Sequence, residues 1–199
     1  MEEIIRRYRY ASIIKIIQHF VLQMNNPVVV DFGCGKSQIS RQLNKLKIKS
    51  QAFDIDEKNV KSGIRRGVDV YYGDIAEMPL ESASVDILVC SEILEHLSDE
   101  KFQKGLKEID RVLSSRGVVI ITVPSSESVR MRGGHKRYVS SSKLSAFFVD
   151  YTLLCEALVY KNAICVKNSS ANLLMVFGKS MQPLFSLDDI FESGGDENE

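Results

Sequence analysis

An acidic residue and two glycines follow an apolar run in the stretch VVVDFGCGKSQIS, residues 28–40. The acid is Asp31, and the glycines are Gly33 and Gly35. Open parallel sheets bind ligands where a buried strand ends and a helix begins. Glycine lets the backbone turn sharply and approach a ligand, because it has no Cβ. The pattern predicts a cofactor site, and the alternative is a tight turn that binds nothing.

Two further acids, Asp54 and Asp74, end the next two apolar runs. Asp54 stands 19 residues after Gly35, where a carboxylate can accept both ribose hydroxyls of a nucleoside. Gln38 replaces the third glycine of a dinucleotide fingerprint, and carboxylates would repel a pyrophosphate. We therefore expect a ligand with amines and hydroxyls but no phosphate. The alternative is that Asp54 and Asp74 cap helices or form turns.

Side chains that can bind a metal lie close together in SEILEHL, residues 91–97. If this stretch is helical, Glu92, Glu95 and His96 share one face, because they stand at positions i, i+3 and i+4. His135, in a later loop, is a fourth candidate ligand. Carboxylates and imidazoles bind divalent cations from Mg²⁺ to Zn²⁺. Without a metal, His96 or His135 is the candidate general base.

The elements that position these residues alternate along the chain. Helical spacing of apolar residues predicts a first helix over 2–24, with its arginines on the solvent-exposed face. Apolar runs indicate strands at 28–32, 50–55, 68–72, 85–90, 117–123, 157–166 and 172–178, and helices are expected at 36–47, 57–66, 99–113 and 140–149. This alternation predicts an α/β fold with three layers and a doubly wound, mostly parallel, seven-stranded sheet. The short turn at 167–170 predicts that the sheet ends in an antiparallel hairpin.

The composition is that of an ordinary globular protein, with 199 residues, 44% of them hydrophobic and 26% charged. We divide the chain into an N-terminal helix (1–26), a ligand-binding domain (27–185) and an acidic mobile tail (186–199). The four cysteines have no C-x-x-C spacing, and neither a signal peptide nor an apolar span is visible. These features predict a cytoplasmic protein with reduced thiols.

The formal net charge of zero is a cancellation between two parts of the chain. The tail at 186–199 holds six acids and no Lys or Arg, which leaves 26 basic and 20 acidic residues elsewhere, a net charge of +6. The loop RMRGGHKR at 130–137 carries four of the positive charges and no acid. It suits an anionic ligand such as a carboxylate, a phosphate, a lipid headgroup or an RNA end, and the alternative is an ordinary solvated loop.

Five motifs, VVVDFGCG, AFDID, GDIAEMPL, SVDILVCSEILEHL and GVVIITVP, stand in order along residues 28–180. In this order and spacing the chain resembles the class I S-adenosylmethionine-dependent methyltransferases. The resemblance implies a Rossmann-like fold and S-adenosyl-L-methionine as cofactor. It implies that Asp31 and the backbone of Gly33 and Gly35 hold the methionine part, with Cys90 and Ser91 lining the same side.

The resemblance also implies how the adenosine part is bound. Asp54 would take the ribose hydroxyls, and Ile55 would pack against adenine. Asp74 would accept the adenine amino group, with Ile75 supplying a backbone N–H.

The sequence E-x-x-E-H at 92–96 together with His135 resembles the metal-assisted O-methyltransferases of this family. These include ubiquinone-pathway methyltransferases and enzymes that methylate the 3′-terminal 2′-hydroxyl of small RNAs. A metal there would lower the pKa of a substrate hydroxyl. In metal-free relatives with similar stretches, the residue matching Glu92 lines the cofactor pocket, and the residue matching His96 is structural or a base.

Two features of the sequence bear on the methyl acceptor. No Asn/Asp-Pro-Pro-Tyr/Phe motif of the amino-directed base methyltransferases occurs, which favours oxygen acceptors. We therefore expect O-methylation of a small or lipid-like, anionic acceptor. The alternatives are an RNA-end 2′-hydroxyl methyltransferase, which would bind RNA through the 130–137 loop, and a non-catalytic S-adenosylmethionine-binding protein.

Overall fold

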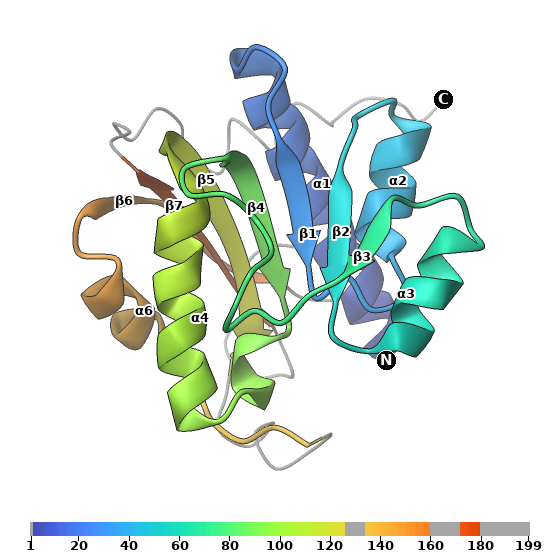
Figure 1. The fold of residues 1–199 in the computed structure, drawn as a ribbon. Helices are drawn as coiled ribbons and strands as arrows, with labels where there is room; N and C mark the ends of the chain where they lie inside the picture. Colours follow the sequence, from blue (N-terminus) through green and yellow to red (C-terminus); the bar gives the residue numbers. More distant parts are fainter. Residues whose placement is uncertain (1, 126–133, 160–171, 180–199) are drawn as a thin grey trace, which may run out of the picture.

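The structure, a computed structural model, describes residues 2–125, 134–159 and 172–179. Seven strands form one sheet in the order β3-β2-β1-β4-β5-β7-β6 (Figure 1). The first five of that order pair in parallel, and β7 pairs antiparallel with both β5 and β6. The predicted mostly parallel sheet with a closing antiparallel hairpin is confirmed. The strands are β1 (Val29–Phe32), β2 (Gln51–Asp54), β3 (Val70–Tyr72), β4 (Val85–Ser91), β5 (Leu113–Pro124), β6 (Tyr151–Val159) and β7 (Asn172–Lys179).

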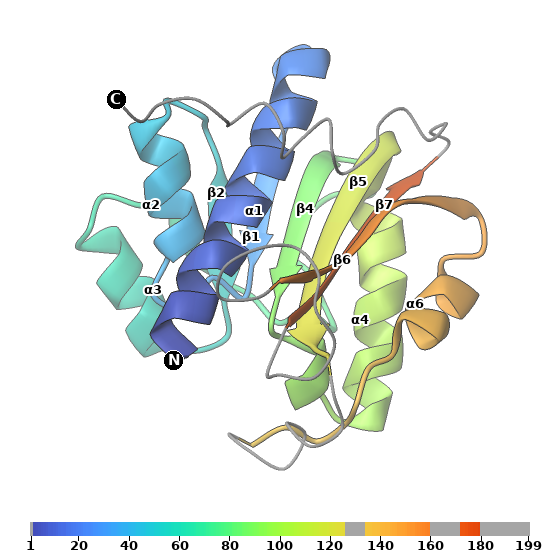
Figure 2. The same ribbon diagram turned by 180° about the vertical axis from the view of Figure 1, so that it is seen from behind.

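Helices cover both faces of the sheet, so the predicted three layers are confirmed (Figures 1 and 2). Helices α1, α2 and α3 lie on one face, and α4 and α6 lie on the other. Within the part of the chain that the structure describes, no helix is long and apolar enough to cross a membrane. The helices are α1 (Glu2–Gln23), α2 (Gln38–Lys45), α3 (Glu57–Ile64), α4 (Asp99–Val112) and α6 (Ser141–Phe147), with a 3₁₀ turn η1 (Leu94–His96).

The closing hairpin differs from the sequence prediction in its first strand. Strand β6 begins at Tyr151, which pairs with Lys179, and not at residue 157. The reason is that α6 ends at Phe147, so the residues that follow extend along β7 at once. The predicted turn at 167–170 and the acidic tail lie outside the described residues.

Helix α1 connects the apolar core to the edge of the sheet where the parallel strands end. Its side chains Ile13, Ile16, Ile17 and Phe20 are fully buried against the sheet. A short connection leads from α1 into β1, so the two run in opposite directions. The first turns of α1 therefore lie near the carboxyl ends of β1 and β4 (Figure 1).

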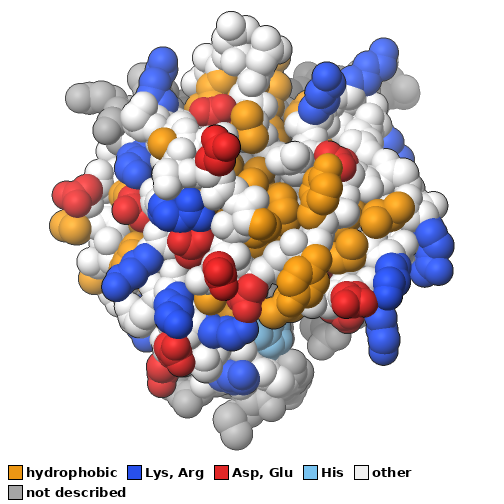
Figure 3. All heavy atoms as spheres, in the orientation of Figure 1, with side chains coloured by type: hydrophobic (Ala, Val, Ile, Leu, Met, Phe, Trp, Pro, Cys, Tyr) orange, Lys and Arg blue, Asp and Glu red, His pale blue; other side chains and the backbone are white. Residues whose placement is uncertain are grey.

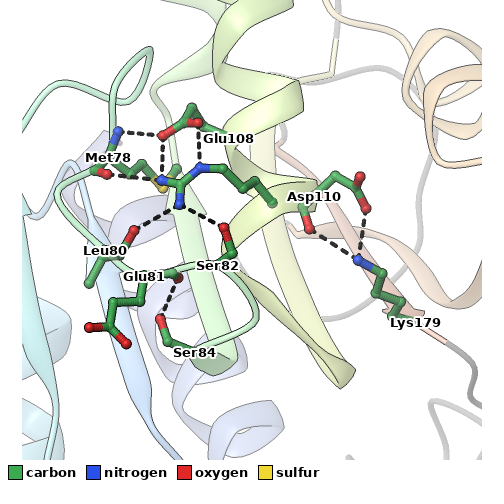
Figure 4. A network of polar contacts seen from close by, with 9 residues as sticks. Met78, Leu80, Glu81, Ser82, Ser84, Glu108, Asp110 and Lys179 are labelled. Atoms are coloured by element: carbon green, nitrogen blue, oxygen red, sulfur yellow. Dashed lines mark hydrogen bonds and ion pairs between the residues drawn. The ribbon is translucent and has the colours of Figure 1, made fainter.

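The connection between β3 and β4 is held by a network of polar contacts around Glu108 (Figure 4). The Arg111 guanidinium donates to the backbone carbonyls of Met78 (3.0 Å) and Leu80 (2.9 Å) and to the Ser82 hydroxyl. It also binds the Glu108 carboxylate in a fork, at 2.7 and 2.8 Å. Glu108 in turn accepts the Met78 N–H at 2.7 Å. Helix α4 thereby fixes the segment that follows β3.

We predict that Arg111→Ala lowers the free energy of unfolding by about 2–3 kcal/mol, because Glu108 and two carbonyls lose a charged donor. Arg111→Lys keeps the charge but not the planar fork, so it should lose about half as much. Urea denaturation measures the change, with the exposed Arg116→Ala as the matched control. Equal losses for Arg111→Ala and Arg116→Ala would contradict the role of this network.

Candidate functional site

The acid of β1 lies below the surface at the carboxyl edge of the sheet. Asp31 is 1% exposed, and its carboxylate accepts a hydrogen bond from the Ser40 hydroxyl at 3.0 Å. Burial raises the pKa of Asp31 to about 7, while the Ser40 hydrogen bonds oppose this rise and the charge of Asp54 adds to it. A cationic group bound nearby would stabilise the ionised form of Asp31.

The loop after β1 depends on backbone conformations that favour glycine. Gly33 and Gly35 have φ angles of +76° and +52°. A Cβ on Gly33 would lie 2.4 Å from the Ile93 side chain, whereas a Cβ on Gly35 would meet nothing within 4 Å. The N–H groups of Gly33 and Cys34 donate to the Phe53 carbonyl at 2.7 and 3.0 Å. The loop is therefore fastened across the end of β2.

Asp54, 7% exposed, closes the same loop from the end of β2. Its carboxylate accepts the Gly35 N–H at 2.7 Å, the Asp56 N–H at 2.8 Å and the Asn59 side-chain amide at 3.2 Å. Asp56, which accepts the Lys58 N–H, is the N-cap of α3, so the helix-cap alternative for Asp54 is wrong. Each carboxylate oxygen has two lone pairs, so Asp54 can also accept from a ligand.

Asp74 follows β3 and is engaged by neighbours in the chain. Its carboxylate accepts the Ala76 N–H at 3.0 Å and pairs with Lys101 at 2.5 Å. Burial alone would raise the pKa of Asp74, but the bonds to Lys101 and Ala76 prevail and lower it. The turn predicted as the alternative role of Asp74 is present. A ligand amine at this carboxylate would compete with Lys101.

The other residues predicted to bind a cofactor differ in exposure. Ile55 is 53% exposed, and hydrophobic side chains reach the surface on the β3 side of Figure 3. Ile75 and Cys90 are buried in the core beneath α4, so only their backbone can line a ligand site. Burial raises the pKa of the Cys90 thiol, and Asp31 adds to that rise. The Ser91 hydroxyl is hydrogen-bonded to that of Thr122 at 2.9 Å.

Glu95, His96 and His135 form a compact cluster at this edge. Each offers one metal-binding atom, and these atoms all lie within 4.8 Å of one another. The rings of His96 and His135 are 4.7 Å apart, and a histidine surface is visible at the lower edge of Figure 3. Glu95 is 1% exposed, and neither of its carboxylate oxygens has a hydrogen-bond partner within the described part of the chain. The structure thus brings together three of the four predicted metal ligands.

The electrostatics of this cluster fit a divalent cation. Burial raises the pKa of Glu95 to about 8, and the charge of Glu92 adds to the rise. Burial and the neighbouring His135 lower the pKa of His96, and the neutral imidazole is the form that binds a metal. The nearest ionisable partner of Glu95 is the His96 ring, 4.0 Å from Oε1. A buried carboxyl without a hydrogen bond is costly, and a cation would remove that cost.

Glu92 does not belong to the cluster. The predicted helical face is not formed at this residue, because η1 begins only at Leu94. Glu92 follows β4 directly and has a left-handed conformation with φ of +57°, and its N–H donates to the Thr122 carbonyl at 2.9 Å. The expectation that Glu92, Glu95 and His96 share one face is therefore corrected: only the last two lie together.

The partners of Glu92 were missed in the sequence. Its Oε2 lies 3.3 Å from Arg9 of α1 and accepts a hydrogen bond from the Asn172 amide at 2.8 Å. Arg9 stands among arginines expected on the exposed face of the first helix, but it is 9% exposed. Asn172 lies 163 residues after Arg9 in the sequence, and no local pattern links Asn172 to Arg9.

The described end of the basic loop is fixed to η1. The N–H of Lys136 donates to the Glu95 carbonyl at 2.7 Å. Arg137 is 9% exposed, and its guanidinium donates to the Leu97 carbonyl at 2.8 Å. Arg137, one of the four basic residues predicted to meet an anionic partner, therefore has a structural role. Residues 126–133 lie outside the described part.

Comparison with known proteins finds a methyltransferase domain in the central part of the chain. A family model described as "Methyltransferase domain" matches residues 30–121. A Mycolicibacterium smegmatis protein named "Probable S-adenosylmethionine-dependent methyltransferase" is 32% identical over 99 residues, which cover 49% of this chain and 38% of that protein. Over residues 30–121 the chain is therefore similar to the S-adenosylmethionine-dependent methyltransferases.

Two further similarities to methyltransferases are informative. A ubiquinone biosynthesis O-methyltransferase of Cupriavidus pinatubonensis is 35% identical over 78 residues, which cover 36% of this chain and 31% of that enzyme. The solved methyltransferase domain of bacterial CtHen1-CN shares the fold, with a TM-score of 0.67 at 16% identity over 87% of this chain and 99% of that one. The chain spans less than half the length of the two curated relatives.

We predict that Gly33→Ala destabilises this methyltransferase fold by about 2–3 kcal/mol and Gly35→Ala by about 1 kcal/mol. Both substitutions force an alanine into the left-handed region, but only the Cβ at position 33 collides with the Ile93 side chain. A double-mutant cycle of Gly33→Ala with Ile93→Ala, followed by urea denaturation, measures the clash directly. A coupling energy of zero would show that Ile93 does not restrict this position.

Proposed function

We propose that this chain transfers a methyl group from S-adenosyl-L-methionine to an acceptor oxygen, with a divalent cation such as Mg²⁺ held by Glu95, His96 and His135. The observation that carries the proposal is the buried Glu95 carboxyl, which has no hydrogen-bond partner among the described residues and lies beside two imidazoles. A cation bound there would lower the pKa of an acceptor hydroxyl and hold its oxygen in place.

The reaction itself asks the protein mainly for positioning. The acceptor oxygen attacks the methyl carbon in line, the carbon–sulfur bond breaks, and the sulfonium becomes the neutral thioether S-adenosylhomocysteine. The acceptor proton leaves to a base or to water. If no metal takes part, His96 or His135 receives that proton as general base. Holding two substrates at attack distance supplies most of the rate enhancement.

The cofactor would lie across the ends of β1, β2 and β3. The buried Asp31 would face the methionine ammonium, and Asp54 would accept from the ribose hydroxyls while it holds the loop closed. The exposed Ile55 would pack on adenine. The full proposed set is Asp31, Gly33, Gly35, Asp54, Ile55, Asp74, Ile75 and Cys90.

We predict that Asp54→Ala weakens S-adenosylhomocysteine binding about a hundredfold, because a charge-assisted hydrogen bond to the ribose is lost and the loop loosens. Isothermal titration calorimetry measures the affinity, and circular dichroism confirms that the variant is folded. Asp69→Ala is the control, because Asp69 directly precedes β3 and so lies at the amino ends of the strands, away from the proposed pocket. This variant should bind as the wild type does. Equal affinity for Asp54→Ala and the control would reject this cofactor pocket.

A sequence similarity and a basic loop indicate the class of the methyl acceptor. Similarity to a ubiquinone biosynthesis O-methyltransferase favours a small or lipid-like acceptor with a hydroxyl group. The basic loop at 130–137 favours an anionic acceptor, and an RNA end methylated on its 2′-hydroxyl is the second candidate. Binding that falls steeply with salt concentration would favour RNA. A chain that binds the cofactor but yields no product with any acceptor would be a non-catalytic binding protein.

We predict that the wild type binds Mn²⁺, used as a probe for Mg²⁺, and that Glu95→Gln or His96→Ala weakens this binding at least about tenfold, because each removes one ligand. The chain has three histidines, so His19→Ala in α1 is the matched control. Calorimetric titration after removal of metal with a chelator measures the affinity. Equal affinity in His96→Ala and His19→Ala would reject the metal site.

A further inference from the structure

The strongest unexplained feature of the site is the triangle formed by Arg9, Glu92 and Asn172. Arg9 donates to Asn172 Oδ1 at 3.2 Å, Asn172 donates to Glu92 Oε2 at 2.8 Å, and Arg9 lies 3.3 Å from the same Oε2. Arg9 lies in α1, Glu92 directly follows β4, and Asn172 begins β7. We call this triangle the Glu92 clamp.

The clamp is buried and uses only part of its hydrogen-bonding capacity. The side chains of Arg9 and Glu92 are 11% and 22% exposed. Both donors reach the same carboxylate oxygen, while Glu92 Oε1 and Arg9 Nε are buried with no hydrogen-bond partner among the described residues. The left-handed backbone at Glu92 shows that the chain accepts strain at this residue.

The clamp lies within electrostatic range of the Glu95–His96–His135 cluster. The charge of Glu92 contributes to the raised pKa of Glu95 and acts on His96 as well. Glu92 is nevertheless absent from the group of residues whose metal-binding atoms lie within 4.8 Å of one another. A carboxylate that could serve as a fourth ligand is thus close to the cluster but bound to other residues.

We propose that Arg9 and Asn172 are positioning residues that hold Glu92 away from the Glu95–His96–His135 cluster, and so limit a bound divalent cation to three protein ligands. This inference rests on the metal site of the proposed function. Glu92 cannot ligate a cation through Oε2 without giving up its bonds to Arg9 and Asn172. Arg9 would then remain buried without its carboxylate, which is strongly unfavourable.

Holding Glu92 away leaves coordination positions on a bound cation that no protein ligand fills. Three protein ligands leave coordination positions for water or for the acceptor oxygen, as catalytic sites require, whereas a closed ligand set is typical of structural sites. Because Arg9 belongs to α1 and Asn172 to β7, elements from both ends of the chain determine how open the site is.

The test compares Mn²⁺ affinity in four full-length proteins at one pH and ionic strength. The variants are Arg9→Met, Asn172→Ala and the double variant Arg9→Met/Glu92→Gln, beside the wild type. Arg9→Met should tighten binding about tenfold, because Glu92 is freed to become a ligand. Asn172→Ala, which changes no charge, should tighten it about threefold. The double variant keeps the net charge of the wild type and should bind as the wild type does.

A second measurement separates ligation from a simple change of charge. The visible absorption bands of Co²⁺ bound to Arg9→Met should differ from those of Co²⁺ bound to the wild type, because a Glu92 carboxylate oxygen replaces water in the ligand set. Arg6→Met, an exposed arginine of the same helix, is the matched control and should change neither affinity nor spectrum. Thermal melts show whether each variant folds, and Asn172→Ala carries the test if Arg9→Met does not.

Each failure has a distinct meaning. Wild-type binding that is lost in His96→Ala but unchanged in Arg9→Met and Asn172→Ala would overturn the clamp alone. A gain in affinity that persists in the double variant would show that Glu92 is not the source of the gain. An unchanged Co²⁺ spectrum would show that the lost positive charge, and not a new ligand, causes the gain. Either result would also overturn the clamp. No Mn²⁺ binding by any of the proteins would remove the proposed metal site and the clamp together.

Discussion

The burial of the central sheet on both faces is the constraint on which the rest of the structure depends. Strands β1, β4 and β5 are apolar at most positions, and helices cover both faces. Charged side chains can therefore stand only near the strand ends, and parallel strands end at one edge. Asp31, Asp54 and Glu95 meet at that edge for this reason. The sheet thus assembles a polar site from segments that are far apart in the sequence.

Features that depend on local pattern could be predicted, and those that depend on distant partners could not. The apolar runs predicted the strands because buried parallel strands are apolar throughout, and the glycines marked a loop that has positive φ at Gly33 and Gly35. A glutamate gives no such signal, so the left-handed Glu92 was expected to continue a helix. Its partners Arg9 and Asn172 stand 163 positions apart in the sequence, and no spacing rule relates them.

Charge counting gave a similarly incomplete picture of the basic residues. Arg137 was counted with an anion-binding loop, but it pairs with Asp99 at 2.8 Å and lies over the Phe102 ring. Arg9 was assigned to an exposed helix face and is buried. Guanidinium groups can stabilise buried carboxylates and carbonyls as well as external anions, because they offer five donors. Fewer basic side chains can therefore meet an external anion than their number suggests, although the excess of +6 is unchanged because both arginines pair with acids.

The polar edge lowers the stability of the fold, and the packing of α1 offsets this cost. A buried Glu95 carboxyl without a hydrogen bond among the described residues and a left-handed Glu92 each cost on the order of 1–3 kcal/mol. Such residues persist only where their surroundings hold them. The Thr122 carbonyl fixes the backbone of Glu92, and α1 carries Arg9 to its side chain while burying Phe20 in the core. Because one helix packs the core and reaches the site, core packing and site geometry are coupled through α1.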